Sequence, residues 1–345
     1  MKLLICLPLA LLSGCTLFGA LSEEEEKMLK QHRAGAGKYF DAHQYEKSIA
    51  QARKGLELAT DDYRLTGVLA WAHLQLSTRP RGDNEEHLFK AQTAFEDLMG
   101  FRDIEDHDPK NVFGFAIALH NWARVEEHRS KRIRREVVKA KKDDRKTMLA
   151  LASEYDRMAL HKDVMAKSYF LKVVDGSFSQ KGNTRESYKY LMAIEYRYDR
   201  VNNAIAYGTK CLELNAEEVK YWQHEYQRTE FAGRERQIRR DLASLKTDEL
   251  KVHSRLAAYF QEKARVPNNK DFKKDYAAAK VHLDAILAER INSSEDYYLR
   301  ATCHRALGNH DDARKDYKMF LSLGKLTREH DAVKDAEEYL YGKGK

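Results

Sequence analysis

Residues 297–323 read YYLRATCHRALGNHDDARKDYKMFLSL, and this stretch decides the fold. Small Ala301 lies in its first half, Gly308 marks a turn, and Ala313 begins the apolar face of the second half, followed by Tyr317. Apolar residues at this spacing indicate two helices separated by a turn. Small side chains let the two helices approach closely, and the tyrosine ring fills the gap to the next pair. The stretch therefore predicts a helical hairpin that stacks on a neighbour.

The same spacing recurs elsewhere in the chain. Ala70 follows Ala36 by 34 residues, and Ala278 precedes Ala313 by 35 residues. This period and the small-residue pattern resemble the tetratricopeptide repeat family, in which each unit is a helix–turn–helix. The resemblance implies an all-α fold, a right-handed α-solenoid of antiparallel helical hairpins. The periodicity predicts about fifteen helical segments.

Composition agrees with helices, since hydrophobic residues make up 43%, charged residues 33%, and prolines number only four. We assign residues 27–345 to one repeat domain, with residues 331–341 as a terminal capping helix. Residues 124–182 and 220–250 match the repeat poorly and predict longer, charged helices in degenerate hairpins. A helical bundle without repeats is the alternative.

The N-terminus has the features of a secretory leader. Lys2 precedes an apolar run over residues 3–12, which ends at Ser13, Gly14 and Cys15. A short basic start, an apolar core and small residues before a cut are typical of a signal peptide. The apolar run is too short to span a bilayer, which needs about 20 residues.

Residues 12–15, LSGC, resemble the lipobox of bacterial lipoproteins. This resemblance implies that residues 1–14 are removed, that Cys15 carries acyl chains such as palmitate, and that residues 15–26 form a lipidated tether. Two or more acyl chains anchor a protein stably. Thr16 stands where an inner-membrane retention signal has aspartate, which favours the outer membrane, facing the periplasm. An ordinary cleaved signal with an incidental cysteine is the alternative.

The tetratricopeptide resemblance also implies a function, which is to bind peptides or proteins in a groove lined by the first helix of each hairpin. The positions that correspond to groove residues are Arg33, Phe40, Tyr298, Thr302 and Arg305. The same side chains would alternatively pack against neighbouring helices or face water. The resulting hypothesis is a scaffold for other envelope proteins, which assists barrel-protein insertion, pilus or secretin assembly, or recruitment of cell-wall enzymes.

Motifs for catalysis are not found in the sequence. There is no phosphate-binding glycine loop and no GxSxG, and His224-Glu225 begins a HExxH pattern that Arg228 interrupts. We therefore expect no enzyme activity, catalytic residue, metal or cofactor. The alternative is a cell-wall hydrolase with a carboxylate pair that the sequence does not reveal.

A basic run covers residues 129–146, with ten lysines and arginines against three acidic residues. Such a run favours contact with anionic lipid or cell-wall polymer. The alternative is the solvated face of a long helix. Nucleic acid is not expected as a partner, because a secreted lipoprotein rarely meets it.

Overall fold

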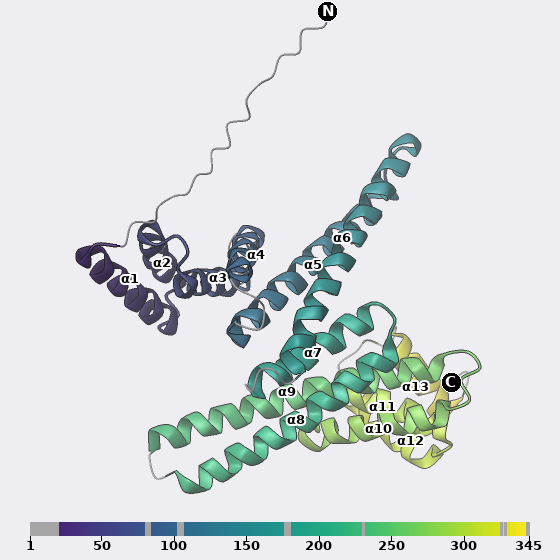
Figure 1. Ribbon diagram of the computed structural model, residues 1–345. Helices are drawn as coiled ribbons and strands as arrows, with labels where there is room; N and C mark the ends of the chain where they lie inside the picture. Colours follow the sequence, from purple (N-terminus) through teal and green to yellow (C-terminus); the bar gives the residue numbers. More distant parts are fainter. Residues whose placement is uncertain are drawn as a thin grey trace, which may run out of the picture. The chain divides into compact units, whose positions relative to one another are not determined.

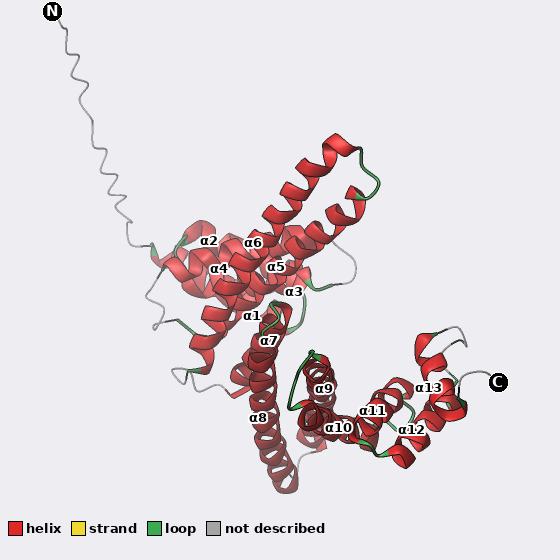
Figure 2. Ribbon diagram, turned by 90° about the vertical axis from the view of Figure 1, so that its right-hand side faces the viewer, coloured by secondary structure: helices red, strands yellow, loops and turns green. Residues whose placement is uncertain are grey.

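The computed structural model describes residues 21–79, 84–101, 107–175, 181–229, 232–324, 327 and 330–342. In these residues every regular element is a helix, and successive helices pair as hairpins (Figure 1; Figure 2). The predicted fold class, an all-α solenoid of antiparallel hairpins, is confirmed. The predicted leader and Cys15 lie outside the described residues.

The helices divide between two compact units, Met1–Asp103 and Ile104–Lys345. The described part of the first unit contains α1 (Glu23–Asp41), α2 (Tyr45–Leu58), α3 (Tyr63–Ser77) and α4 (Asn84–Gly100). The described part of the second contains α5 (Pro109–Val137), α6 (Lys142–Val174), α7 (Lys181–Arg197), α8 (Val201–Arg228), α9 (Ala232–Arg265), α10 (Phe272–Glu289), α11 (Ser294–Leu307), α12 (His310–Ser322) and α13 (Asp331–Tyr341).

Thirteen helices are described, where the periodicity predicted about fifteen segments. The difference lies in the charged regions that match the repeat poorly. There α5, α6 and α9 run for 29, 33 and 34 residues without a break, and no proline lies in their interiors. None of the described helices is both long and apolar enough to cross a membrane.

The start of α1 falls inside the segment 15–26 that the sequence assigns to the tether. The N–H of Glu25 donates to Ser22 Oγ at 3.3 Å, and the N–H of Ser22 donates to the Glu25 carboxylate at 2.8 Å. This reciprocal pair is a capping box, which satisfies two backbone N–H groups at once. The helix therefore begins at Glu23.

Small residues bring the helices of the first unit together. Ala36 of α1 and Ala52 of α2 are fully buried and share a cluster with Leu29 and Leu65. The Ser48 hydroxyl donates to the Ala36 carbonyl at 2.8 Å, so α1 and α2 are also joined by a buried hydrogen bond. The predicted role of Ala36 as a close-contact position is thus realised.

In the second unit each helix from α5 to α13 packs against the next. Gly208 of α8 marks the closest approach, because a Cβ atom there would lie 2.7 Å from Leu256 Cδ2 and 2.8 Å from Met192 Sδ. Ala204 and Cys211, one turn to either side, are also buried. A glycine and two small residues therefore make the seam along which α7, α8 and α9 meet.

The stack ends in the capping helix that the sequence predicts. Val333 and Ala336 of α13 are buried in one cluster with Ala301, Tyr317 and Phe320 of the last hairpin. Tyr317 is fully buried, so its ring fills the space between the hairpin and the cap. The outer face of α13 is polar, as the end of a repeat array requires.

Candidate protein-binding site

An open cavity of about 790 Å³ lies between α1 and α3 in the first unit. Exposed Lys30 and Arg64 line it, and within the described residues neither has an acidic side chain at ion-pair distance. The cavity has an apolar wall formed by Leu21, Leu29, Leu65 and Val68. Glu26 also lines it. Apolar walls beside unpaired positive charge suit a protein segment that carries an apolar side chain next to a carboxylate.

Arg33, a predicted groove residue, lines the same cavity but has a structural partner. Its Nε and Nη2 each lie 2.5 Å from Asp62 Oδ2. The other oxygen of Asp62 accepts the N–H of Leu65 at 2.9 Å and so caps α3. The Asp62 side chain is only 1% exposed. Arg33 therefore holds α1 against the start of α3, and Lys30 and Arg64 remain to meet a ligand.

Phe40, also predicted as a groove residue, is not part of this cavity. Its ring lies 5.4 Å from the ring of Tyr45, and both pack on a cluster that contains Ile49 and Leu76. Phe40 therefore joins the first hairpin to α3.

Tyr298 and Arg305 of α11 meet at one carboxylate of the capping helix. The Tyr298 hydroxyl donates to Asp335 Oδ2 at 3.1 Å, and Arg305 Nη1 lies 3.0 Å from Asp335 Oδ1. Tyr298 also lines a cavity of about 570 Å³ with Phe320 and His330. The structure thus brings together two predicted groove residues, and α13 engages both.

Thr302, the third predicted groove residue of α11, faces α9. Its hydroxyl donates to the Leu299 carbonyl at 2.7 Å, and Gln261 of α9 places its Nε2 3.5 Å from that hydroxyl. The same amide nitrogen lies 3.0 Å from the Leu299 carbonyl and 3.1 Å from Cys303 Sγ. Thr302 is therefore part of the contact between α9 and α11.

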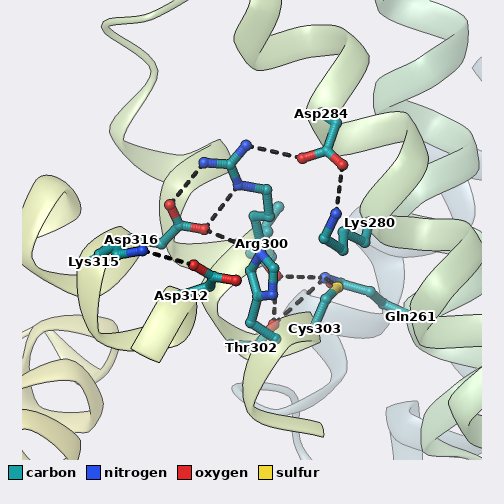
Figure 3. A network of polar contacts seen from close by, with 11 residues as sticks. Gln261, Lys280, Asp284, Arg300, Thr302, Cys303, Asp312, Lys315 and Asp316 are labelled. Carbon is teal, nitrogen blue, oxygen red and sulfur yellow. Dashed lines mark hydrogen bonds and ion pairs between the residues drawn. The ribbon is translucent and has the colours of Figure 1, made fainter. Parts of the chain in front are cut away.

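An ion-pair network centred on Arg300 joins three helices (Figure 3). Two guanidinium nitrogens of Arg300 bind both oxygens of Asp316 on α12, at 2.8 and 2.7 Å. A third nitrogen lies 2.9 Å from Asp284 on α10, which also accepts from Lys280 at 2.7 Å. Hydrogen bonds with Asp316 raise the pKa of the Arg300 guanidinium above its ordinary value. This network, which the sequence did not reveal, locks α10, α11 and α12 together.

A second buried network joins α5, α6 and α7. Asp163 is fully buried and lies 2.9 Å from His120 Nδ1, and it also accepts from Arg197 and from the Tyr198 hydroxyl. Burial lowers the pKa of His120, although the hydrogen bond with Asp163 opposes that shift. Every member has a partner within the protein, so the network is a tie between helices.

Two histidine pairs lie between helices, with His73 buried and His87, His253 and His282 partly exposed. His73 Nδ1 lies 2.9 Å from His87 Nδ1, and His253 Nδ1 lies 2.8 Å from His282 Nδ1. Burial, reinforced by the neighbouring His87, lowers the pKa of His73 to about 4. Burial and the neighbouring His253 lower the pKa of His282 to about 4. Both rings are therefore held neutral in the folded chain.

This arrangement predicts a loss of stability in mild acid. A lowered histidine pKa means that the stabilising contribution is complete above the unfolded value of about 6.5 and is lost as the pH falls toward 4. At pH 5 the unfolded chain binds a proton at His73 and at His282 more readily than the folded chain does. We expect each histidine to lower the free energy of unfolding by on the order of 2 kcal/mol relative to neutral pH. Melting temperatures at pH 7.5 and 5.0 measure the loss, and the variant with His73→Gln and His282→Gln should show a shallower pH dependence. Equal pH dependence in the two proteins would contradict the prediction.

A third cavity, of about 610 Å³, lies between the α7–α8 and α9–α10 turns. Of the three cavities described here, this one is lined by two carboxylates, those of Asp199 and Glu262. Glu262 accepts a hydrogen bond from the Tyr196 hydroxyl at 2.6 Å, which occupies one of its oxygens. A glycoside hydrolase needs two carboxylates at a defined separation, and the shared lining alone does not establish such a pair.

The described residues contain neither an activated cysteine nor a cluster of metal-binding side chains. Cys211 and Cys303 are buried, and burial raises the pKa of each thiol to about 11, which disfavours the reactive thiolate. No group of three or more histidine, cysteine or acidic side chains in the described ranges is arranged to hold a metal ion.

The solved structures that match this chain are only loosely similar to it. No protein-family model matches the sequence, and no curated protein matches it. PilF of Pseudomonas aeruginosa is 12% identical, with a TM-score of 0.42 over 91% of this chain and 98% of that chain. The TPR2AB domain of yeast Sti1 is 13% identical, with a TM-score of 0.28 over 92% and 98%. Yeast Tom70 is 12% identical, with a TM-score of 0.24 over 92% and 81%. The assignment of the fold rests on the helix pairing of this chain.

Proposed function

We propose that this chain is a scaffold that holds protein partners in the bacterial envelope, anchored to the outer membrane through acyl chains on Cys15. The observation that carries the first part is the cavity between α1 and α3. Lys30 and Arg64, which have no acidic partner among the described residues, stand 34 residues apart, so they occupy equivalent positions in consecutive hairpins. A partner segment lying across both hairpins would meet one cation from each.

The chemistry of the cavity defines the partner segment. Its apolar wall accepts one apolar side chain, and Lys30 and Arg64 pair with carboxylates beside it. Barrel-protein insertion, pilus or secretin assembly and recruitment of cell-wall enzymes are envelope processes in which such a scaffold would act. A lipid anchor would hold the scaffold at the membrane where these processes occur.

Site-specific crosslinking in cells tests the scaffold. A photoreactive residue at Ala34, which lines the cavity, should capture one envelope protein, whereas the same residue at exposed Glu57 of α2 should not. We expect Lys30→Glu with Arg64→Glu to lower the yield about tenfold, because two favourable charge contacts become repulsive.

The matched control replaces Lys38 and Lys54 by glutamate, which changes the net charge equally on exposed helix positions of the same unit. This variant should keep the crosslink. Equal capture from Ala34 and Glu57, or equal loss in both variants, would refute a binding site at this cavity.

The anchor has its own test. Cys15→Ala should abolish incorporation of labelled palmitate, because the thiol is the point of attachment. Cys6→Ala, within the predicted leader, is the control and should leave labelling unchanged. Full labelling of the Cys15→Ala protein would place the modification elsewhere.

A further inference from the structure

The α5–α6 hairpin projects from the rest of the second unit. Both helices run well past α7, and their far turn stands clear of α7 to α13 in both views (Figure 1; Figure 2). The turn lies at residues 138–141, in the middle of the basic run 129–146. The tertiary structure therefore concentrates the largest charge feature of the sequence at one protruding tip.

Some of the cations at this tip have partners. Arg134 binds Asp156 at 2.6 Å, Lys131 binds Glu127, and Arg129 lies 3.4 Å from Glu126. These pairs lie on the shaft of the hairpin and join α5 to α6 or neighbouring turns of α5.

The remaining cations are exposed and face solvent. Within the described residues, no acidic side chain lies at ion-pair distance from these six: Arg132, Arg135, Lys139, Lys141, Lys142 and Lys146. Exposed long side chains with no partner keep their full charge available for an anionic surface. Arg145 also has no acidic partner among the described residues, and Glu136, Asp143 and Asp144 are exposed at the same tip. The tip is thus a small knob with a net positive charge.

An apolar side chain is exposed in the turn of this knob. Val138, at the end of α5, is 76% exposed, and Leu149 and Leu151 of the first turns of α6 are 42% and 44% exposed. Arg145 donates to the carbonyls of Ala140 and Val138 at 3.0 and 3.4 Å, so the turn that presents Val138 is pinned. The exposed valine is therefore held in place by a hydrogen-bonded turn.

We infer that the α5–α6 tip docks on an anionic phospholipid bilayer, with the lysines and arginines on the headgroups and Val138 at the level of the acyl boundary. The knob protrudes in both views (Figure 1; Figure 2), and none of the three cavities described above lies in this hairpin. A protruding tip can reach a flat surface, whereas several modes of peptide recognition use a groove or a sheet edge. Basic side chains around an apolar one match the bilayer interface, where charge and hydrocarbon meet. The inference goes beyond the protein scaffold and does not depend on it.

Vesicle sedimentation of the full chain with Cys15→Ser, which removes acylation, tests this contact. The protein should bind vesicles that contain phosphatidylglycerol more tightly than phosphatidylcholine vesicles, and the difference should shrink as salt is added. Neutralising three tip lysines, with Lys139→Gln, Lys141→Gln and Lys142→Gln, should weaken binding on the order of a hundredfold. The apolar leader is the same in every protein compared, so its contribution cancels.

The chain supplies a matched control for charge. Lys270, Lys273 and Lys274 are also exposed and also have no acidic partner among the described residues. Their replacement by glutamine changes the net charge by the same amount and should leave vesicle binding within about twofold. Circular dichroism should show equal helicity in both triple variants, since all six lysines are exposed.

A second pair of variants tests the apolar contact. Val138→Asp should weaken binding to phosphatidylglycerol vesicles by about tenfold or more. The two valine methyl groups would no longer enter the acyl boundary of the bilayer, and the new carboxylate would be repelled by the anionic headgroups. Val281→Asp, at a valine of α10 that is 63% exposed, should not. Equal effects within either matched pair would overturn the inference. So would binding of the tip to polyglutamate without binding to the vesicles, which would assign it to an acidic protein.

Discussion

Replacing Arg300 with methionine is expected to destabilise the last hairpins of the second unit by about 3–5 kcal/mol, because the change leaves a buried carboxylate without its cation. Asp316 is the residue at risk, since it is 5% exposed and binds Arg300 through both oxygens. Asp284 keeps Lys280 as a partner and contributes less to the loss. Hydrogen exchange of the α10, α11 and α12 amides, with denaturant melts, measures the change.

Two further variants separate charge burial from a general loss of packing. Arg314→Met removes an exposed arginine of α12, whose pair with Asp311 is open to solvent, and should cost about 0.5 kcal/mol or less. Adding Asp316→Leu to Arg300→Met should recover at least half of the loss, because the uncompensated charge is gone. A single Arg300→Met variant as stable as Arg314→Met would show that the network contributes little.

Truncating Tyr317 to alanine should cost about 3–5 kcal/mol and release the capping helix. The ring is fully buried, with ring centres 5.9 Å from Tyr298 and 5.1 Å from Tyr339. Its loss leaves a cavity between the last hairpin and α13 that the surrounding helices fill only in part. We expect amides of α13 to exchange as fast as in an unfolded segment, which mass spectrometry measures.

Met319→Ala is the matched control, because Met319 lies two residues along the same helix and is 42% exposed. It should cost about 0.5 kcal/mol or less and leave the exchange of α13 unchanged. Tyr317→Phe keeps the ring and should retain most of the stability. If the α13 amides stayed protected from hydrogen exchange in the Tyr317→Ala protein, the packing of α13 would not depend on Tyr317.

The candidate cavity was only partly visible in the sequence. Arg33 was assigned to a groove by the resemblance to tetratricopeptide repeats, and it does line the cavity, but it is engaged by Asp62. Lys30 and Arg64, which have no acidic partner in the part of the chain that the structure describes, were missed. Their separation of 34 residues is the repeat period, so cations at equivalent positions of consecutive repeats were the signal that would have found them.

The groove positions of the last repeat depended on a segment far along the chain. Tyr298 and Arg305 both bind Asp335, which lies 37 and 30 residues later. The sequence predicted a capping helix there, but it did not indicate that one carboxylate of that helix would engage two groove positions. Such contacts follow from the angle at which α13 packs, which no local pattern contains.

The sequence by itself determined the helices, the repeat and the cap, because these follow from apolar spacing, turn glycines and small residues that act over a few neighbouring positions. Only the tertiary structure decided which charges are paired. Arg300 meets carboxylates 16 residues away in both directions, whereas six cations of the basic run meet none among the described residues. The physical reason is that an ion pair depends on which helix faces pack together, while helix formation depends on the chain nearby.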